Sequence, residues 1–166
     1  METEKATFGA GCFWGVEHFF AEVPGVIDAA SGYEGGHADN PNYRQVCTGT
    51  TNHAEVVEVT FDPTKVSYAR LVDLFFKMHD PTQLNRQGPD VGTQYRSVIF
   101  THSPEQERVA REELEKAKGS GRYSRPIVTV IEPAQTFWRA EDYHQDYFVK
   151  NQGHSCHVTY KELERQ

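Results

Sequence analysis

The stretch 8-FGAGCFWGVEHFF-20 decides how the amino-terminal part of the chain folds. Its apolar residues, with Val23 just beyond them, recur at the spacing of one helical face. This pattern predicts a helix from about Phe13 to Ala21, which Pro24-Gly25 ends. Cys12 therefore stands where the helix begins, among three glycines, and the question is why a cysteine is needed there.

A thiol at the start of a helix is chemically favoured as a thiolate. The first N–H groups of a helix carry partial positive charge, which stabilises the ionised sulfur. Gly9, Gly11 and Gly15 leave space for a ligand beside Cys12. The pattern indicates a reactive thiol, and it leaves open the alternative that Cys12 packs under the helix as a small hydrophobic residue.

Two large aromatic residues, Phe13 and Trp14, follow the thiol. Aromatic residues at a helix start commonly belong to the core. If Cys12 faces a pocket, at least one of them lines it, and an aromatic face suits a polarizable S-methyl group. A thioether-like substrate is thus one reading of this pair.

Beyond this helix, strands and helices are mixed without regular alternation, which favours an α+β two-layer sandwich with a mixed sheet over a doubly wound parallel sheet. Two long polar loops, 34–53 and 80–94, are expected to be functional because compact domains rarely contain such loops otherwise. We expect one catalytic domain over residues 1–166, with an irregular tail over 150–166. The predicted strands are Val26–Tyr33, 54–63, Tyr95–Thr101 and Ile127–Ile131, and the predicted helices are Ser67–His79, Ser103–Lys118 (Ser103 as N-cap, Pro104 in the first turn) and Ala140–Val149.

Composition limits the function classes. The chain has 166 residues, a formal net charge of −7, 37% hydrophobic and 25% charged residues. An acidic chain is a poor candidate for nonspecific binding to nucleic acid or to anionic membranes. No apolar run reaches the ~18 residues of a spanning helix, and the first residues do not read as a secretory signal, so we expect a cytoplasmic protein. The three cysteines are too few and too scattered for a secreted disulfide framework.

Glu55 has an unexpected position in the predicted strand 54-AEVVEVTF-61. Alternation places it on the same face as Val57, Val59 and Phe61, whereas Glu58 lies on the other face. A carboxyl group buried there without a cation would keep its proton near neutral pH and could act as an acid. The alternative is that Glu55 lies at the strand mouth and reaches solvent.

Tyr43 and Tyr95 border the two polar loops, and Asp90 lies within the second. Phenol hydroxyl groups beside a protonated carboxyl could hold a substrate oxygen by hydrogen bonds. Tyrosines at loop ends are common, so each of them carries little weight alone.

These residues together resemble the peptide methionine sulfoxide reductases of the A type, which act on the S epimer. The resemblance covers nearly the whole chain, and its Gly-Cys-Phe-Trp-Gly element is highly specific. It implies a ferredoxin-like α+β core with long coil segments. The matching segments are 10-AGCFWGVE-17, 31-SGYEGG-36, 40-NPNYRQVCTGTTNHAEVVEV-59, 88-GPDVGTQYRSVIF-100 and 137-FWRAEDYHQDY-147.

The resemblance assigns a role to most candidate residues. It implies that Cys12 is the nucleophile that attacks the sulfoxide sulfur and that Glu55 protonates the sulfoxide oxygen. Phe13 and Trp14 match the aromatic wall that receives the S-methyl group. Tyr43 and Tyr95 match the oxygen-binding phenols, and Asp90 matches an acidic residue of the same polar network.

Recycling of the enzyme is implied in the same way. Cys156, in 151-NQGHSCHV-158, stands at the family's recycling position and would form a disulfide with Cys12 after a sulfenic acid intermediate. A dithiol such as thioredoxin would reduce this disulfide, and no cofactor or metal is implied. Some members carry two recycling cysteines in a glycine-rich tail, whereas this tail has one. We expect a monomer that acts on oxidised proteins, peptides or free methionine sulfoxide, and we interpret Cys47 as a buried, non-catalytic thiol.

Two other function classes have partial support in the sequence. A cysteine hydrolase would pair Cys12 with a histidine base, but none of the eight histidines stands in a recognisable hydrolase motif. A zinc-binding module would use His154, Cys156 and His157, but three ligands within four residues cannot easily surround one tetrahedral ion.

Overall fold

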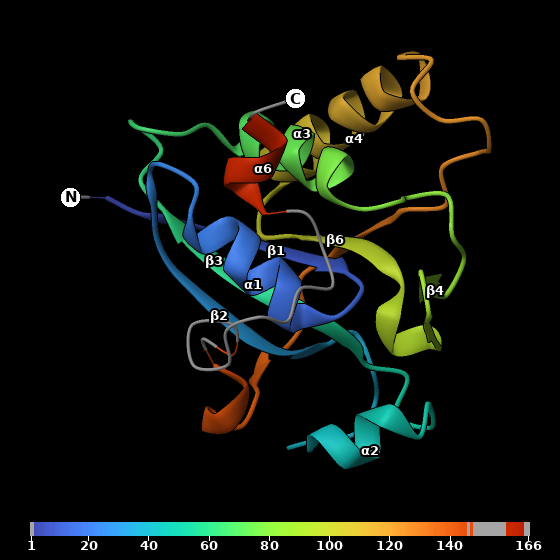
Figure 1. The fold of residues 1–166 in the computed structure, drawn as a ribbon. Coiled ribbons are helices and arrows are strands. Elements are labelled where there is room, and N and C mark those ends of the chain that lie inside the picture. Colours follow the sequence, from blue (N-terminus) through green and yellow to red (C-terminus); the bar gives the residue numbers. More distant parts are fainter. Residues whose placement is uncertain (1, 146, 148–158, 165–166) are drawn as a thin grey trace.

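The computed structural model describes residues 2–145, 147 and 159–164 (Figure 1). Its central part has the element order β1-α1-β2-β3-α3-β6, in which the four strands lie in the spatial order β6-β1-β3-β2 and pair antiparallel. This is the ferredoxin-like arrangement. The elements are β1 (Glu4–Ala10), α1 (Phe13–Ala21), β2 (Val26–Glu34), β3 (Ala54–Phe61), α3 (Tyr68–Met78) and β6 (Ser97–Thr101).

Two further strands extend the sheet at its edges. β7 (Val130–Pro133) pairs parallel with β6, and β8 (Trp138–Arg139) pairs antiparallel with β2. The result is a mixed sheet of six strands in the order β7-β6-β1-β3-β2-β8. Pro133 is tolerated because it lies in an edge strand, where a missing backbone donor disrupts no central pairing.

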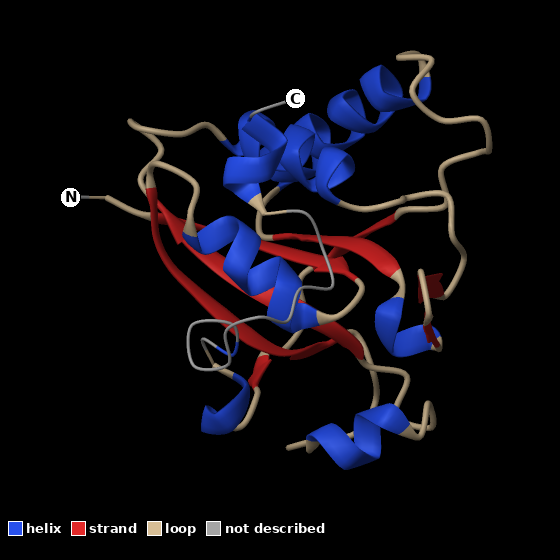
Figure 2. Ribbon diagram, in the orientation of Figure 1, coloured by secondary structure: helices blue, strands red, loops and turns tan. Residues whose placement is uncertain are grey.

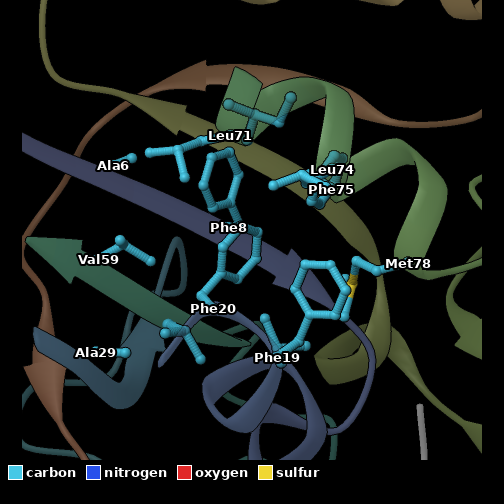
Figure 3. Packing of buried hydrophobic residues seen from close by; sticks show 14 of the residues in the cluster. Ala6, Phe8, Phe19, Phe20, Ala29, Val59, Leu71, Leu74, Phe75 and Met78 are labelled. Carbon is cyan, nitrogen blue, oxygen red and sulfur yellow. The ribbon is translucent and has the colours of Figure 1, made fainter. Parts of the chain in front are cut away.

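Helices cover one face of the sheet (Figure 2). The main hydrophobic core lies between this face and helices α1, α3 and α4 (Pro104–Lys118). In this core the ring of Phe8 from β1 stacks on Phe20 of α1 and on Phe75 of α3, at centroid distances of 5.0 and 5.2 Å (Figure 3). The two helices are thus fixed on the central strand.

On the opposite face, the described loop over residues 134–137 packs against the sheet. Val56 and Phe100 belong to a small second cluster, against which Ala134 and Phe137 pack. Gly32 on this face is required by close approach, because a Cβ atom there would lie 2.4 Å from the ring of Phe137. This face therefore anchors the segment that leads into residues 140–145.

The remaining described elements are short. They are α2 (Tyr43–Cys47), β4 (Arg86–Gln87), β5 (Asp90–Val91), the 3-10 turns η1 (Thr93–Tyr95) and η2 (Asp142–His144), and α6 (Tyr160–Glu164). β4 and β5 form a separate hairpin. The ring of Tyr160 in α6 packs edge-on against the ring of Phe19 in α1, with 6.0 Å between the ring centroids, so α6 lies against α1.

The predicted α+β two-layer fold with a ferredoxin-like core is confirmed. The helices predicted at Phe13–Ala21, Ser67–His79 and Ser103–Lys118 are present as α1, α3 and α4. Ser103 is the N-cap of α4, since its hydroxyl accepts a hydrogen bond from the N–H of Gln106 at 3.1 Å.

Some sequence predictions were wrong. The central strand β1 was not predicted, and the strand expected at Ile127–Ile131 starts later, as β7. Over residues 140–145, the helix expected at Ala140–Val149 is only the turn η2, because the side chain of Gln145 bonds the backbone of Ser31 at 3.0 and 2.9 Å and holds this segment on the sheet. The tail expected to be irregular contains α6.

In the part of the chain that the structure describes, no helix is both long and apolar enough to cross a membrane.

Candidate active site

The elements that carry the predicted site meet at one end of the strands of the sheet. Because the strands pair antiparallel, the end of β1, the end of β2 and the starts of β3 and β6 lie side by side at this end of the sheet. Cys12 follows β1, Glu55 is the second residue of β3, and Tyr95 comes shortly before β6. The fold therefore brings together residues that are forty or more positions apart in the sequence.

Cys12 is the N-cap residue of α1 and its side chain is 8% exposed. The preceding residue, Gly11, has a φ of 95°, a conformation that residues with a side chain rarely adopt. This glycine turns the chain from β1 into the helix, so that the thiol lies at the positive end of α1. Cys12 is therefore nearly buried and also lies where a helix favours the thiolate. Its burial alone does not decide whether it is a reactive thiol or a small hydrophobic residue packed under the helix.

Glu55 lies directly beside this helix start. Its side chain is 1% exposed, and its Oε1 accepts a hydrogen bond of 3.3 Å from the backbone N–H of Phe13. Its strand neighbours Val57 and Val59 belong to the main core, which confirms the predicted face and excludes the solvent-exposed alternative. Glu58, on the other face, forms an ion pair of 2.7 Å with Lys5.

Weak acids surround the Glu55 carboxyl. Burial, followed by the charge of Glu55, raises the pKa of both Tyr43 and Tyr95, so both phenols stay protonated and can donate hydrogen bonds. The charge of Asp90 makes a smaller contribution to the raised pKa of Tyr95.

Phe13, Trp14 and Tyr43 form an aromatic cluster beside the thiol. Phe13 is fully buried, and its ring lies 6.2 Å from that of Tyr43. Trp14 is partly buried and stacks in parallel on Tyr147 at 3.7 Å. Phe13 is a core residue and a site neighbour at once, so the two readings of the aromatic pair do not exclude each other.

Two residues at this site were not singled out from the sequence, although the quoted segment 137–147 contains them. His144 accepts a hydrogen bond at Nδ1 from Nε1 of Trp14 at 2.9 Å and is 1% exposed. Glu141 accepts hydrogen bonds from the hydroxyl of Tyr33 at 2.9 Å and from the backbone N–H of Tyr43 at 3.1 Å. No sequence periodicity signals such contacts, since they join residues about a hundred positions apart.

The interpretation of Cys47 as a buried thiol was wrong. Cys47 is exposed at the end of α2, and its side chain shares a hydrogen bond with Tyr43. Partial desolvation of the sulfur, with the charges of Glu55 and Glu141, raises the pKa of this thiol, although the bond to Tyr43 opposes the shift. Helix α2 was missed inside a polar loop, but its capping box of Asn42 and Gln45 is a signal that the sequence contains.

Cys156, the predicted recycling cysteine, lies outside the described residues, and so do His154 and His157. Within residues 2–145, 147 and 159–164, no group of three or more histidine, cysteine or acidic side chains could hold a metal ion.

A thiol at a helix start, a buried carboxyl beside it and a wall of aromatic rings define the site of a thiol-dependent enzyme. The chain matches the family model for peptide methionine sulfoxide reductase over residues 4–166. It is 62% identical over 157 residues to the peptide methionine sulfoxide reductase MsrA of Methanoculleus marisnigri, covering 95% of this chain and 96% of that protein. It is 63% identical over 153 residues to MsrA of Geobacter sulfurreducens, covering 92% and 94%.

Solved structures agree. The reduced form of Mxr1 from Saccharomyces cerevisiae superposes with a TM-score of 0.87 at 40% identity, covering 93% of this chain and 90% of that one. Methionine sulfoxide reductase A of Corynebacterium diphtheriae superposes with a TM-score of 0.80 at 45% identity, covering 93% and 77%. The chain belongs to the peptide methionine sulfoxide reductase family and is an oxidoreductase of the A type.

Proposed function

We propose that the chain reduces methionine S-sulfoxide by direct attack of the Cys12 thiolate on the sulfoxide sulfur. The attack forms a bond between the two sulfur atoms while the protonated oxygen leaves as water. Addition of water to the Cys12 sulfur then breaks this bond, so that Cys12 becomes a sulfenic acid, methionine is released as a thioether, and two electrons have passed from one sulfur to the other. Glu55 supplies a proton to the sulfoxide oxygen as the S–O bond breaks, and Tyr43 and Tyr95 donate hydrogen bonds to that oxygen. Phe13 and Trp14 hold the S-methyl group.

The observation that carries this proposal is the position of Glu55. Its carboxyl group is buried, and the backbone N–H of Phe13, the residue after Cys12, donates to it. A proton donor beside a thiol at a helix start supplies the two groups that the reduction needs, a nucleophile for sulfur and an acid for oxygen.

Recycling follows from a second thiol. The Cys156 thiol condenses with the Cys12 sulfenic acid, which releases water and forms a disulfide. Tyr147 stacks on Trp14, and Tyr160 packs on Phe19, so both flanks of the segment that contains Cys156 lie against α1. Four residues span at most about 14 Å, and Phe19 is seven residues along the helix from Cys12, or roughly 10 Å. This comparison supports the proposal that Cys156, four residues before Tyr160, can reach the end of α1 that carries Cys12.

Thioredoxin reduces the resulting disulfide in this proposal, with no bound cofactor. A solved structure of yeast Mxr1 in complex with Trx2 superposes on this chain with a TM-score of 0.65 at 25% identity, covering 95% of this chain and 90% of that one, which supports such a partner. The biological role would be repair of oxidised proteins and peptides, or reduction of the free sulfoxide, in the cytoplasm. In this proposal the chain acts as a monomer.

A cysteine hydrolase has no support of this kind. Its base would be a histidine, and His144, which lies at the site, already uses Nδ1 to accept the Trp14 hydrogen bond. No described contact joins its other nitrogen to Cys12.

The test is turnover with each separated epimer of a blocked methionine sulfoxide and a dithiol. We expect methionine from the S epimer only, and none from the Cys12→Ser variant. Product from the R epimer at a similar rate would contradict the proposed geometry, and turnover by Cys12→Ser would contradict the nucleophile.

A further inference from the structure

The side-chain carboxylate of Glu141 accepts hydrogen bonds from residues of three different elements. Its Oε1 accepts from the hydroxyl of Tyr33 in β2 at 2.9 Å. Its Oε2 accepts from the backbone N–H of Tyr43 in α2 at 3.1 Å and from the hydroxyl of Tyr143 in η2 at 3.0 Å. Both carboxylate oxygens are therefore used, and the residue ties together segments that are distant in sequence.

Two of these donors, Tyr33 and Tyr43, lie next to the site. Tyr33 is fully buried, and its ring lies 5.6 Å from that of Phe13. Tyr43 is the first residue of α2, which has five residues. A helix of this length has little stability of its own, so its position depends on the groups that hold its ends. Glu141 holds the end that carries the Tyr43 phenol.

We propose that Glu141 is a positioning residue for the reduction: its carboxylate fixes the start of α2 so that the Tyr43 hydroxyl meets the sulfoxide oxygen as the S–O bond breaks. The proposal rests on the role given to Tyr43 above. Glu141 touches the backbone of Tyr43 and not its hydroxyl, so it acts through Tyr43.

The charge of Glu141 is suited to this task. Burial opposes ionisation, but hydrogen bonds from its own and the Tyr43 backbone N–H groups and from the tyrosine hydroxyls outweigh it and lower the pKa of Glu141. The group is ionised at neutral pH, and hydrogen bonds to a carboxylate are stronger than those to a neutral acceptor. In Glu141→Gln, the amide NH₂ would face at least one of the three donors, which removes an acceptor without changing the shape.

A double-mutant cycle tests the proposal. We expect Glu141→Gln to slow single-turnover reduction at saturating sulfoxide about tenfold, the effect of one charge-assisted hydrogen bond, and to change sulfoxide affinity less than about twofold. In a Tyr43→Phe background, Glu141→Gln should cause no further loss, because the hydroxyl that Glu141 positions is gone. A purely structural role would slow both backgrounds equally, and such additivity would overturn the proposal.

Tyr143→Phe is the matched control, since it removes the exposed donor to the same carboxylate and should leave the rate unchanged. Urea unfolding of each variant separates loss of folded protein from loss of rate. If Glu141→Gln does not fold, Glu141→Asp keeps the charge and withdraws the oxygens by one methylene, and it should show the same non-additivity with Tyr43→Phe; an additive result there overturns the proposal too.

Two failures can be told apart. If Tyr43→Phe reduces sulfoxide as fast as the original protein, the role of Tyr43 in the proposed function is wrong, and that of Glu141 falls with it. If Tyr43→Phe is slow but the cycle is additive, only the role of Glu141 is wrong.

Discussion

The backbone N–H of Phe13 donates a hydrogen bond of 3.3 Å to Oε1 of Glu55. This contact joins the first turn of α1 to the start of β3, and it places a buried carboxyl beside the residue that follows Cys12. The same N–H group belongs to the helix end whose positive charge favours a thiolate. The two groups that the proposed reduction needs are thus held by one local structure.

Glu55→Gln is expected to slow the chemical step at least about a hundredfold, since a positioned general acid contributes this much or more. Sulfoxide binding should change little, because the proton matters only as the S–O bond breaks. Rapid-quench single-turnover kinetics measure both quantities. Glu58→Gln in the same strand is the control and should behave as the original protein; an unchanged rate in Glu55→Gln would remove Glu55 from the acid role.

Loss of the hydrogen bond from Trp14 to His144 should lower the free energy of unfolding. His144→Phe keeps a ring of similar size but leaves Nε1 of the partly buried Trp14 without its acceptor, which costs about 1 kcal/mol in the free energy of unfolding. Urea unfolding followed by tryptophan fluorescence measures it. A stability equal to that of the original protein would show that Trp14 finds another partner.

The same pair gives a pH dependence. Burial lowers the pKa of His144, so the folded protein holds this histidine neutral. The unfolded chain takes up the proton below about 6.5, and stability therefore falls as pH drops through that value. We expect the stability difference between the original protein and His144→Phe to shrink on acidification from pH 8; a difference that is constant with pH would contradict the assignment.

Glu34 should make the opposite contribution. It is fully buried, and burial, opposed by the hydrogen bond from Gln135, raises its pKa to about 7. The folded state prefers the protonated form, so stability is greatest below the unfolded value and falls as pH rises from about 4.5 towards 7. Glu34→Gln should remove this loss and raise stability at pH 8 by up to roughly 3 kcal/mol. Unfolding at pH 5 and pH 8 tests it, with Glu112→Gln on the exposed face of α4 as control; a destabilised Glu34→Gln at pH 8 would contradict it.

Cys47 should react as an accessible thiol of raised pKa. In a variant with Cys12 and Cys156 replaced by serine, Cys47 should be labelled by a disulfide reagent without unfolding, and the rate should still be rising above pH 9, because the thiolate is the reactive form. Tyr43→Phe in the same background removes the hydrogen bond that lowers the pKa, so its labelling should be slower at each pH. Protection from labelling until the protein unfolds would contradict the exposed position.

The sequence was informative where a pattern repeats along the chain. The apolar spacing of α1 and α3, the Ser103-Pro104 start of α4 and the alternation in β3 each reflect a single element facing one core, and each predicted its element. The alternation also predicted that Glu55 shares the apolar face, although it left open whether the carboxyl group reaches solvent. The central strand β1 was missed because it is buried along most of its length and contains Thr7 and Gly9, so it shows neither alternation nor a continuous apolar run.

The site was predictable in its residues but not in its supports. Cys12, Phe13 and Glu55 lie close together as expected, because the antiparallel register brings their elements to one edge. The contacts of Glu141 and His144 depend on how residues 140–145 cross the sheet, and this path is set by Gln145 on Ser31 rather than by any local propensity. Cys47 was expected to be buried, as free cysteines commonly are, whereas α2 exposes its last residue.

The central claim is that Cys12 is oxidised to a sulfenic acid as the sulfoxide is reduced to methionine, and trapping this sulfenic acid tests it most directly. Cys156→Ser is mixed with the S epimer in the absence of reductant, dimedone is added, and methionine and protein adducts are counted by mass spectrometry. The account predicts one methionine per chain and one dimedone adduct, on Cys12. Methionine formed with no adduct on Cys12, or with the adduct on Cys47 instead, would contradict it.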